Sequence, residues 1–327
     1  MRSRRTRTSS PPTSAPSSPE FGVPRGSLSG TVEGVHVEYR GDTVNTVVIS
    51  PHLDDAVLSC STLLEAGPTK IITIFSGPPV DHSMLGYYDE VTGATSSRAR
   101  VFERTHEDHE ALDGLVESVV RLPFKDAQYL QSPTAAEVAD AIAINLLGAD
   151  RVVFPSALGG HIDHRLARDA CVLGVAEGLF PECELTAFAD YPYASEADGW
   201  PAWVRTSDPM GLHVDADWDG ELAVLAECGF SLTPVVRRLD DAAIDRKLER
   251  SRLYRTQFDA LDNESGRVSS RENLMFEVEF KLSTHGLLVA PEGVARELGP
   301  EVRASPTRAR GGIITTLRPK VGRLLGR

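Results

Sequence analysis

Short runs of β-branched and apolar residues alternate along this chain with segments of helical pattern, and this alternation most limits the possible fold. The runs predict buried strands at 46–50 (TVVIS), 70–75 (KIITIF), 119–122, 151–154 (RVVF) and 185–188. Helices are expected at 56–64, 98–117, 135–147, 163–177 and 241–259, a long loop at 77–97 and an edge strand at 275–282. Apolar strands separated by such helices are typical of a parallel sheet. We therefore expect an α/β fold: a Rossmann-like, mostly parallel sheet with helices on both faces.

The two ends of the chain differ in composition from the part between them. Residues 1–30 are rich in Ser, Pro and Arg and predict a disordered basic segment. Residues 301–327 form a basic tail. The part between them, residues 31–300, predicts one domain, and the apolar content of 41% is enough for a sizeable core.

Charge and hydropathy exclude several classes of partner. The net charge is −13 although both ends are basic, so residues 31–300 are strongly acidic and repel phosphate backbones. We therefore expect no nucleic-acid partner. No apolar run reaches the ~18–20 residues that span a bilayer, so no integral membrane segment is expected. Four cysteines form no CxxC pair, which favours free thiols and a cytoplasmic location.

Histidines and aspartates follow two of the predicted strands, each just before a predicted helix. The first cluster is His52-Leu53-Asp54-Asp55 and the second is His161-Ile162-Asp163-His164. Ligands bind at the carboxyl ends of strands in such sheets. Two imidazoles and one carboxylate, from His52, Asp55 and His164, are the ligands of a catalytic Zn²⁺ site with open positions. Asp54 suits a general base, and His161 suits a donor to a developing oxyanion.

Two other interpretations of these residues are open. Asp54, Asp55 or Asp163 can instead cap the helix that follows, as Asp commonly does. A third cluster, 106–109 (HEDH), also places two histidines near each other, but the pattern is not HExxH and the helix is very polar. The occurrence of two His/Asp clusters at strand ends favours the metal site over both.

The two clusters resemble the signatures of the PIG-L/LmbE-like zinc-dependent de-N-acetylases. That family has a strand followed by HPDD and a later HPDH, which stand here as HLDD (52–55) and HIDH (161–164), with ITIFSG (72–77) after the second strand. A weaker similarity is the late helix with Tyr254 and Gln257. The resemblance covers about residues 45–260 and implies a PIG-L/LmbE-like catalytic domain.

The resemblance implies a role for each matching residue. His52, Asp55 and His164 would bind Zn²⁺, and Asp54 would be the general base for the attacking water. His161 would stabilise the oxyanion, and Asp163 would orient a histidine. The implied reaction removes an N-acyl group, commonly N-acetyl, from an amino sugar or a sugar-containing conjugate. Ligands of this kind also accept Fe²⁺ or another divalent ion.

Substrate contacts and alternative functions are less constrained. Arg98, Arg100 and Tyr191 are candidates for substrate binding, and the expected partner is a small amino sugar or glycoconjugate. The sequence does not indicate an oligomeric state. One alternative is an amidase of a thiol–sugar conjugate. Another is a non-catalytic module that binds a sugar or nucleotide in the same pocket, although the chain has neither GxGxxG nor GxxxxGK[ST].

Overall fold

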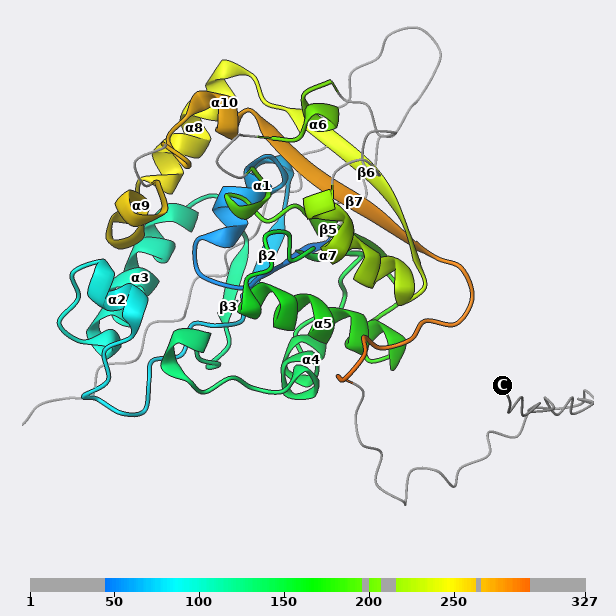
Figure 1. The fold of residues 1–327 in the computed structure, drawn as a ribbon, viewed down its shortest axis with the longest axis horizontal. Coiled ribbons are helices and arrows are strands. Elements are labelled where there is room, and N and C mark those ends of the chain that lie inside the picture. Colours follow the sequence, from blue (N-terminus) through cyan, green and yellow to red (C-terminus); the bar gives the residue numbers. More distant parts are fainter. Residues whose placement is uncertain (1–44, 196–199, 207–215, 263–265, 295–327) are drawn as a thin grey trace, which may run out of the picture. The chain divides into compact units, whose positions relative to one another are not determined.

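The computed structural model describes residues 45–195, 200–206, 216–262 and 266–294, which form a seven-stranded sheet covered by helices (Figure 1). The strands are β1 (Thr46–Ser50), β2 (Thr69–Thr73), β3 (Ser118–Arg121), β4 (Arg151–Pro155), β5 (Glu184–Phe188), β6 (Phe230–Arg238) and β7 (Phe276–Thr284). Their order is β3-β2-β1-β4-β5-β7-β6. The first five are parallel, and β7 is antiparallel to both β5 and β6. The expected α/β fold with a mostly parallel sheet is confirmed.

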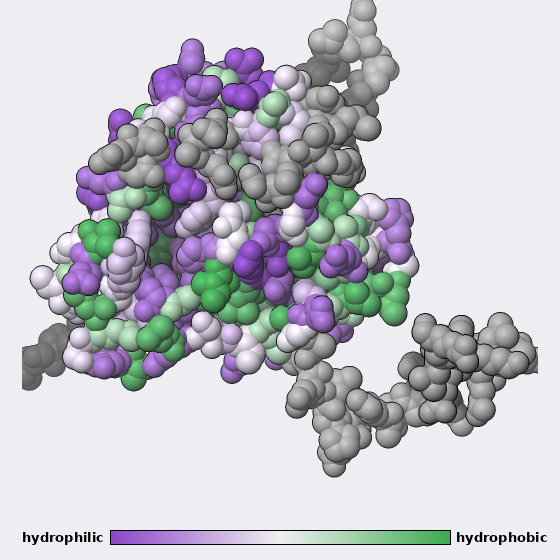
Figure 2. Space-filling model, viewed as in Figure 1, coloured by the Kyte–Doolittle hydropathy of each residue, from purple (hydrophilic) through white to green (hydrophobic). Residues whose placement is uncertain are grey.

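The described helices vary widely in length. They are α1 (Asp55–Ala66), α2 (Tyr87–Val91), α3 (Ser97–Leu112), α4 (Ala135–Ala143), α5 (Ile162–Ala176), α6 (Ala202–Thr206), α7 (Ala216–Glu227), α8 (Asp241–Ser251), α9 (Arg255–Asp262) and α10 (Arg271–Leu274). None of these described helices combines the length and apolar character needed to cross a membrane. The surface over the highly charged α8 is mainly hydrophilic (Figure 2).

The central strands are buried on both faces of the sheet, which explains their continuous apolar sequences. In β1, Val47 and Ile49 belong to a core cluster that includes residues of α4 and α5. Val48 points to the other face, where it belongs to a cluster with residues of α1 and α3. All three side chains are at most 4% exposed. Helices on both faces are therefore required to bury this sheet.

The two His/Asp clusters meet because β1 lies where the strand order reverses. From β1 the chain adds β2 and β3 on one side, and then returns to add β4 and β5 on the other. β1 and β4 are parallel neighbours, with Val48 opposite Val153. Their carboxyl ends therefore lie at the same edge, at the position where open α/β sheets bind ligands.

The antiparallel part of the sheet differs from the sequence prediction. The strand expected at 275–282 exists as β7, but it lies inside the sheet, between β5 and β6. The edge strand on this side of the sheet is β6, which was not predicted because its mostly half-exposed residues include Pro234 and two arginines at its end. Proline is tolerated on an edge strand, where a missing N–H leaves no ladder bond unmade.

Helix boundaries differ in four places, one of which is the helix expected over 135–147, which ends at Ala143. The helix expected over 98–117 ends at Leu112, shortly before Gly114, which has a φ of +66°. The helix expected over 241–259 is divided into α8 and α9, and the expected loop at 77–97 contains the short helix α2. The predicted basic segments 1–30 and 301–327, and both predicted domain boundaries, lie outside the described residues.

Candidate functional site

The turn after β1 is held by hydrogen bonds that bring His52 and Asp55 together. The Ser50 hydroxyl donates to the backbone oxygen of His52 at 2.6 Å and accepts from the backbone N–H of Ala56 at 3.1 Å. The backbone N–H of His52 donates to Oδ2 of Asp55 at 2.7 Å. The imidazole and the carboxylate are therefore fixed by local sequence at the start of α1.

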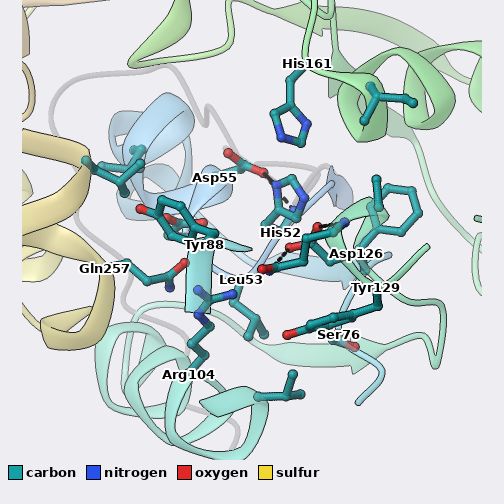
Figure 3. Close-up of a pocket in the computed structure, with 18 of the residues that line it drawn as sticks. His52, Leu53, Asp55, Ser76, Tyr88, Arg104, Asp126, Tyr129, His161 and Gln257 are labelled. Carbon is teal, nitrogen blue, oxygen red and sulfur yellow. Dashed lines mark hydrogen bonds and ion pairs between the residues drawn. The ribbon is translucent and has the colours of Figure 1, made fainter. Parts of the chain in front are cut away.

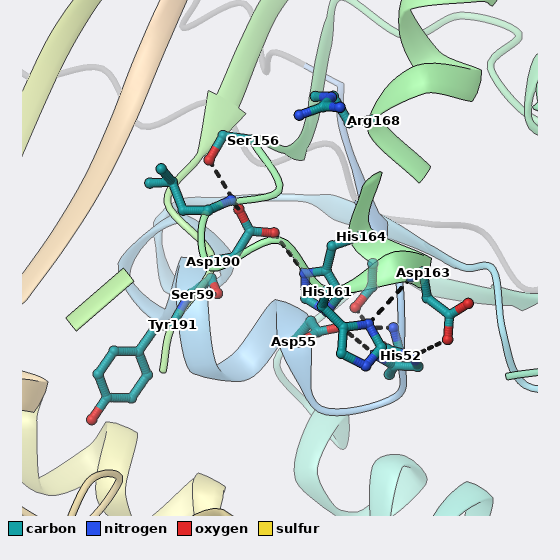
Figure 4. Close-up of polar contacts among 12 residues, drawn as sticks. His52, Asp55, Ser59, Ser156, His161, Asp163, His164, Arg168, Asp190 and Tyr191 are labelled. Atoms are coloured by element: carbon teal, nitrogen blue, oxygen red, sulfur yellow. Dashed lines mark hydrogen bonds and ion pairs between the residues drawn. The ribbon is translucent and has the colours of Figure 1, made fainter. Parts of the chain in front are cut away.

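Donor atoms from the two clusters meet around one carboxylate oxygen, Oδ2 of Asp55 (Figure 4). Oδ2 of Asp55 lies 3.2 Å from Nδ1 of His52 and 3.3 Å from Nε2 of His164. Ligands about 2.0–2.1 Å from a tetrahedral ion lie about 3.3 Å apart. His164 is fully buried, and its Nε2 has no hydrogen-bond partner among the described residues. A buried nitrogen that faces a carboxylate but makes no hydrogen bond is costly unless something binds it, so these residues fit a small divalent ion.

The other nitrogen of each imidazole is held by a carboxylate. Nε2 of His52 lies 3.0 Å from Oδ2 of Asp163, which also accepts from the backbone N–H of Ala127. Nδ1 of His164 lies 2.7 Å from Oδ1 of Asp190. Carboxylates commonly orient metal-binding histidines in this way. Burial lowers the pKa of His52, but its hydrogen bonds to Asp163 and Asp55 outweigh that effect and raise it well above the usual value.

Asp190 was missed as an orienting residue by the sequence analysis. Its second carboxylate oxygen accepts from the Ser156 hydroxyl at 2.9 Å and from the backbone N–H of Leu158 at 3.0 Å, both in the loop after β4. The carboxylate is therefore fixed from two sides before it contacts His164. Its position just after β5, the neighbour of β4, was the available signal.

The helix-cap interpretation does not hold for Asp54 or Asp163. The Asp54 side chain makes no capping hydrogen bond to α1. In α5 it is Nδ1 of His161 that accepts from the backbone N–H of Asp163, at 3.3 Å. Asp54 instead lines a cavity, where burial and the neighbouring Asp55 carboxylate raise its pKa to about 6.

His161 lies beside both histidines of the converging set. Its ring centroid is 5.1 Å from that of His52 and 5.1 Å from that of His164. A ring nitrogen of each of these three histidines lies within 4.8 Å of the others. Burial, together with the two neighbouring imidazoles, lowers the pKa of His161 to about 4. Its imidazole is therefore neutral near pH 7.

A cavity of about 320 Å³ opens beside these residues (Figure 3). Its wall combines the two clusters with side chains from α2, α3 and α9. The polar lining includes His52, Asp54, Asp55, Tyr88, Arg104, Asp126, His161, Tyr193 and Gln257, and the apolar lining includes Leu58, Phe75, Val101 and Leu261. The cavity is thus shaped for a polar organic molecule that reaches the converging donors.

The three residues predicted to bind substrate do not line this cavity. The Arg100 guanidinium donates to the backbone oxygens of Thr92 and Thr256. The Arg98 guanidinium lies over the Phe102 ring. Tyr191 is 1% exposed, and its hydroxyl donates to the backbone oxygen of Arg267 at 2.6 Å.

Their neighbours Arg104 and Tyr193 line the cavity instead. Arg104 is one helical turn after Arg100, on the same face of α3. Tyr193 is two residues after Tyr191 and follows the same strand, β5. The two segments, α3 and the stretch after β5, were therefore predicted correctly. Which residue of each segment faces the cavity depends on tertiary packing.

The HEDH segment at 106–109 is structural. Asp108 accepts from Arg121 and from the Tyr254 hydroxyl, and Glu107 accepts from the backbone N–H and the hydroxyl of Thr256. Its two histidines are exposed. Among the described residues, no group suited to a metal includes this segment.

Gly159 makes room for Tyr193 beside the histidines. A Cβ added at Gly159 would lie 2.4 Å from the Cβ of Tyr193, and the φ of Gly159 is +80°. The Tyr193 ring centroid is 5.2 Å from that of His164 and 5.6 Å from that of His161. Any side chain at position 159 must therefore displace the ring that packs on both imidazoles.

We expect Gly159→Ala to lower the free energy of unfolding by about 1–3 kcal/mol and to reduce activity. The matched control is Gly178→Ala, where φ is +69° but no atom lies within 4 Å of the added Cβ. Chemical denaturation of both variants separates backbone strain from the clash. Equal destabilisation of the two would contradict the clash with Tyr193.

Comparison with known proteins agrees with this geometry. Residues 47–173 match the model of the family described as PIG-L, GlcNAc-PI de-N-acetylase. This part of the chain is similar to the PIG-L family. Over 178 residues the chain is 34% identical to 2'-N-acetylparomamine deacetylase of Streptomyces fradiae, in an alignment that covers 47% of this chain and 59% of the relative. The chain thus spans less than two thirds of that curated relative's length.

Solved structures show the same fold around the PIG-L segment. Teicoplanin deacetylase Orf2, in a zinc-inhibited form, has a TM-score of 0.57 at 21% identity, covering 74% of this chain and 99% of that one. The A40926 pseudoaglycone deacetylase Dbv21 has a TM-score of 0.55 at 23% identity, covering 75% and 99%. At these identities the similarity establishes the fold alone.

Proposed function

We propose that this chain is a metal-dependent hydrolase that removes an N-acetyl group from an amino sugar or a sugar-containing conjugate. The observation that carries the proposal is the convergence of His52 Nδ1, Asp55 Oδ2 and His164 Nε2 beside Asp54 and His161. The PIG-L match over 47–173 and the deacetylase name of the Streptomyces relative support it.

His52, Asp55 and His164 would hold the metal ion. Two imidazoles and one carboxylate suit Zn²⁺, and we propose zinc, although the same ligands accept Fe²⁺. A divalent ion in this position supplies a Lewis acid and lowers the pKa of water. Asp163 and Asp190 keep the two imidazoles turned toward Asp55. The other roles in the reaction belong to side chains in the cavity wall.

Asp54 is the base in this proposal. Its carboxylate takes a proton from the attacking water as the water oxygen bonds to the acyl carbon. The C–N bond then breaks, and the departing nitrogen receives the proton that Asp54 took from the water, so the products are acetate and a free amine. The Asp54 side chain is available for this because it makes no capping bond to α1.

His161 stabilises the negative charge that develops on the acyl oxygen. Its Nδ1 accepts from the backbone N–H of Asp163, so the proton of the neutral imidazole is assigned to Nε2. Nε2–H is then a donor held in place before the reaction, which is what charge stabilisation in a transition state requires. The lowered pKa of His161 keeps the ring in this neutral form.

A panel of acyl groups on one amino sugar tests the proposal. We expect the zinc-loaded protein to release acetate and free amine from N-acetylated amino sugars, N-acetylparomamine among them, and a chelator to stop the release. Preference for a bulky thiol-containing acyl group would favour the amidase. Sugar binding without amine release, unaffected by chelators, would favour the non-catalytic module and contradict a hydrolase.

A further inference from the structure

The cavity wall opposite the histidines contains buried hydrogen-bond donors without partners. Among the described residues, the Tyr88 hydroxyl, Nε of Arg104 and Nε2 of Gln257 make no hydrogen bond. All three side chains line the cavity (Figure 3), and Arg104 and Gln257 are each only 6% exposed. A buried polar group left unpaired destabilises the fold, so three at one place indicate a missing ligand.

The donors are held in position by contacts behind the wall. Nη2 of Arg104 lies 3.0 Å from Oδ1 of Asp89, which is fully buried and accepts from the Tyr129 hydroxyl at 2.8 Å through its other oxygen. The Arg104–Asp89 contact lacks hydrogen-bond geometry. The Arg104 guanidinium lies 5.3 Å from the centroid of the Tyr88 ring. The wall is therefore ordered before any ligand binds.

The charges around the wall indicate what the ligand carries. Asp89 balances the charge of Arg104, while Asp54, Asp55 and Asp126 also line the cavity. An anionic group would be repelled by these carboxylates. The unpaired nitrogens of Arg104 and Gln257 can only donate, and the Tyr88 hydroxyl has a hydrogen to donate as well as lone pairs to accept with. The complementary ligand is an uncharged group rich in oxygen acceptors.

We infer that Tyr88, Arg104 and Gln257 form a subsite that binds ring hydroxyl groups of the sugar whose acylated nitrogen faces Asp54. The inference rests on the proposed function and adds which part of the substrate this wall selects. Burial, and then the Asp54 carboxylate, raise the pKa of Tyr88 to about 12, so its hydroxyl keeps its proton and donates near the reacting amide. The wall therefore distinguishes a hydroxylated ring from a deoxygenated or purely aliphatic amide.

The test measures affinity, so that it does not depend on turnover. In the zinc-loaded Asp54→Asn background, titration calorimetry gives the Kd of N-acetylglucosamine and of its 3-deoxy, 4-deoxy and 6-deoxy analogues. We expect Tyr88→Phe, which keeps the ring against Arg104, to raise the Kd of the parent sugar about tenfold. With the one analogue that lacks the bonded hydroxyl, Tyr88→Phe should change the Kd little, because the bond is already absent. Gln257→Met serves as a second variant.

The outcomes separate the subsite from the reaction. An unchanged Kd for every sugar in both variants would overturn the subsite, even if the wild type releases acetate. An equal weakening for parent and all deoxy sugars would assign Tyr88 a structural role and overturn it too. If the Kd depended on both Tyr88 and one sugar hydroxyl while the wild type released no acetate, that result would support the subsite and contradict the hydrolase.

Discussion

Replacing Asp54 with Asn is expected to lower kcat on an N-acetylated amino sugar by about 10³-fold and to leave the bound metal in place. A general base contributes about 10²–10⁴-fold, and Asn keeps the shape of the side chain but cannot accept the proton. Asp54 lies beside Asp55, but it is not one of the three converging donors. Acetate release and elemental analysis of the same preparation measure both quantities.

The control for Asp54→Asn is Asp81→Asn, because Asp81 is exposed and its carboxylate bonds only to Ser83 among the described residues. We expect wild-type kcat and metal content in that variant. An Asp54→Asn protein with wild-type kcat would show that another group takes the proton. If Asp54→Asn lost metal along with activity, Asp54 would be a ligand and not the base.

Replacing His164 with Ala is expected to remove the metal and all measurable turnover. The buried His164 joins Asp55 to Asp190, with contacts of 3.3 and 2.7 Å. Without the imidazole, the ion loses one of its three protein ligands. Inductively coupled plasma mass spectrometry should find about one zinc or iron per wild-type chain and at least tenfold less in the variant.

The matched control for this loss is His106→Ala. His106 belongs to the competing HEDH segment, is exposed, and pairs with Glu110 at 3.2 Å. We expect its metal content to equal that of the wild type. Because His164→Ala leaves two buried carboxylates without their partner, thermal unfolding is checked in parallel, and the less buried His52→Ala is a second variant. If folded His164→Ala and His52→Ala kept the metal and His106→Ala lost it, the metal site would lie at α3 and not at the two His/Asp clusters.

Most of the parallel part of the fold was predictable because β1, β2, β4 and β5 are largely buried on both faces and therefore read as mainly apolar runs. These four strands and the half-exposed edge strand β3 were all placed within two residues at either end. The two histidine–aspartate clusters were predictable as a pair for the same reason, since parallel neighbours end at one edge of a sheet. The strand β6 was not predictable, because Pro234 interrupts its mostly half-exposed sequence and two arginines end it.

The rest of the site depends on contacts that no sequence pattern records. Asp190 acts through His164, 26 positions earlier in the chain. Arg104 faces the cavity, whereas Arg100 one turn before it bonds to backbone oxygens, and only the packing of α3 against α9 decides between them. Gly159 and Tyr193 are complementary in shape across a loop. These are tertiary contacts, and local propensity does not determine them.

The measurement that tests the account most directly is acetate release by metal-free protein as metal is added back. The chelator-treated chain is titrated with Zn²⁺, and separately with Fe²⁺ without oxygen, in the presence of an N-acetylated amino sugar. The account predicts no release at the start and a rise to a plateau at about one ion per chain, with no rise in His164→Ala. Full acetate release before any metal is added, or none at any metal content, would contradict it.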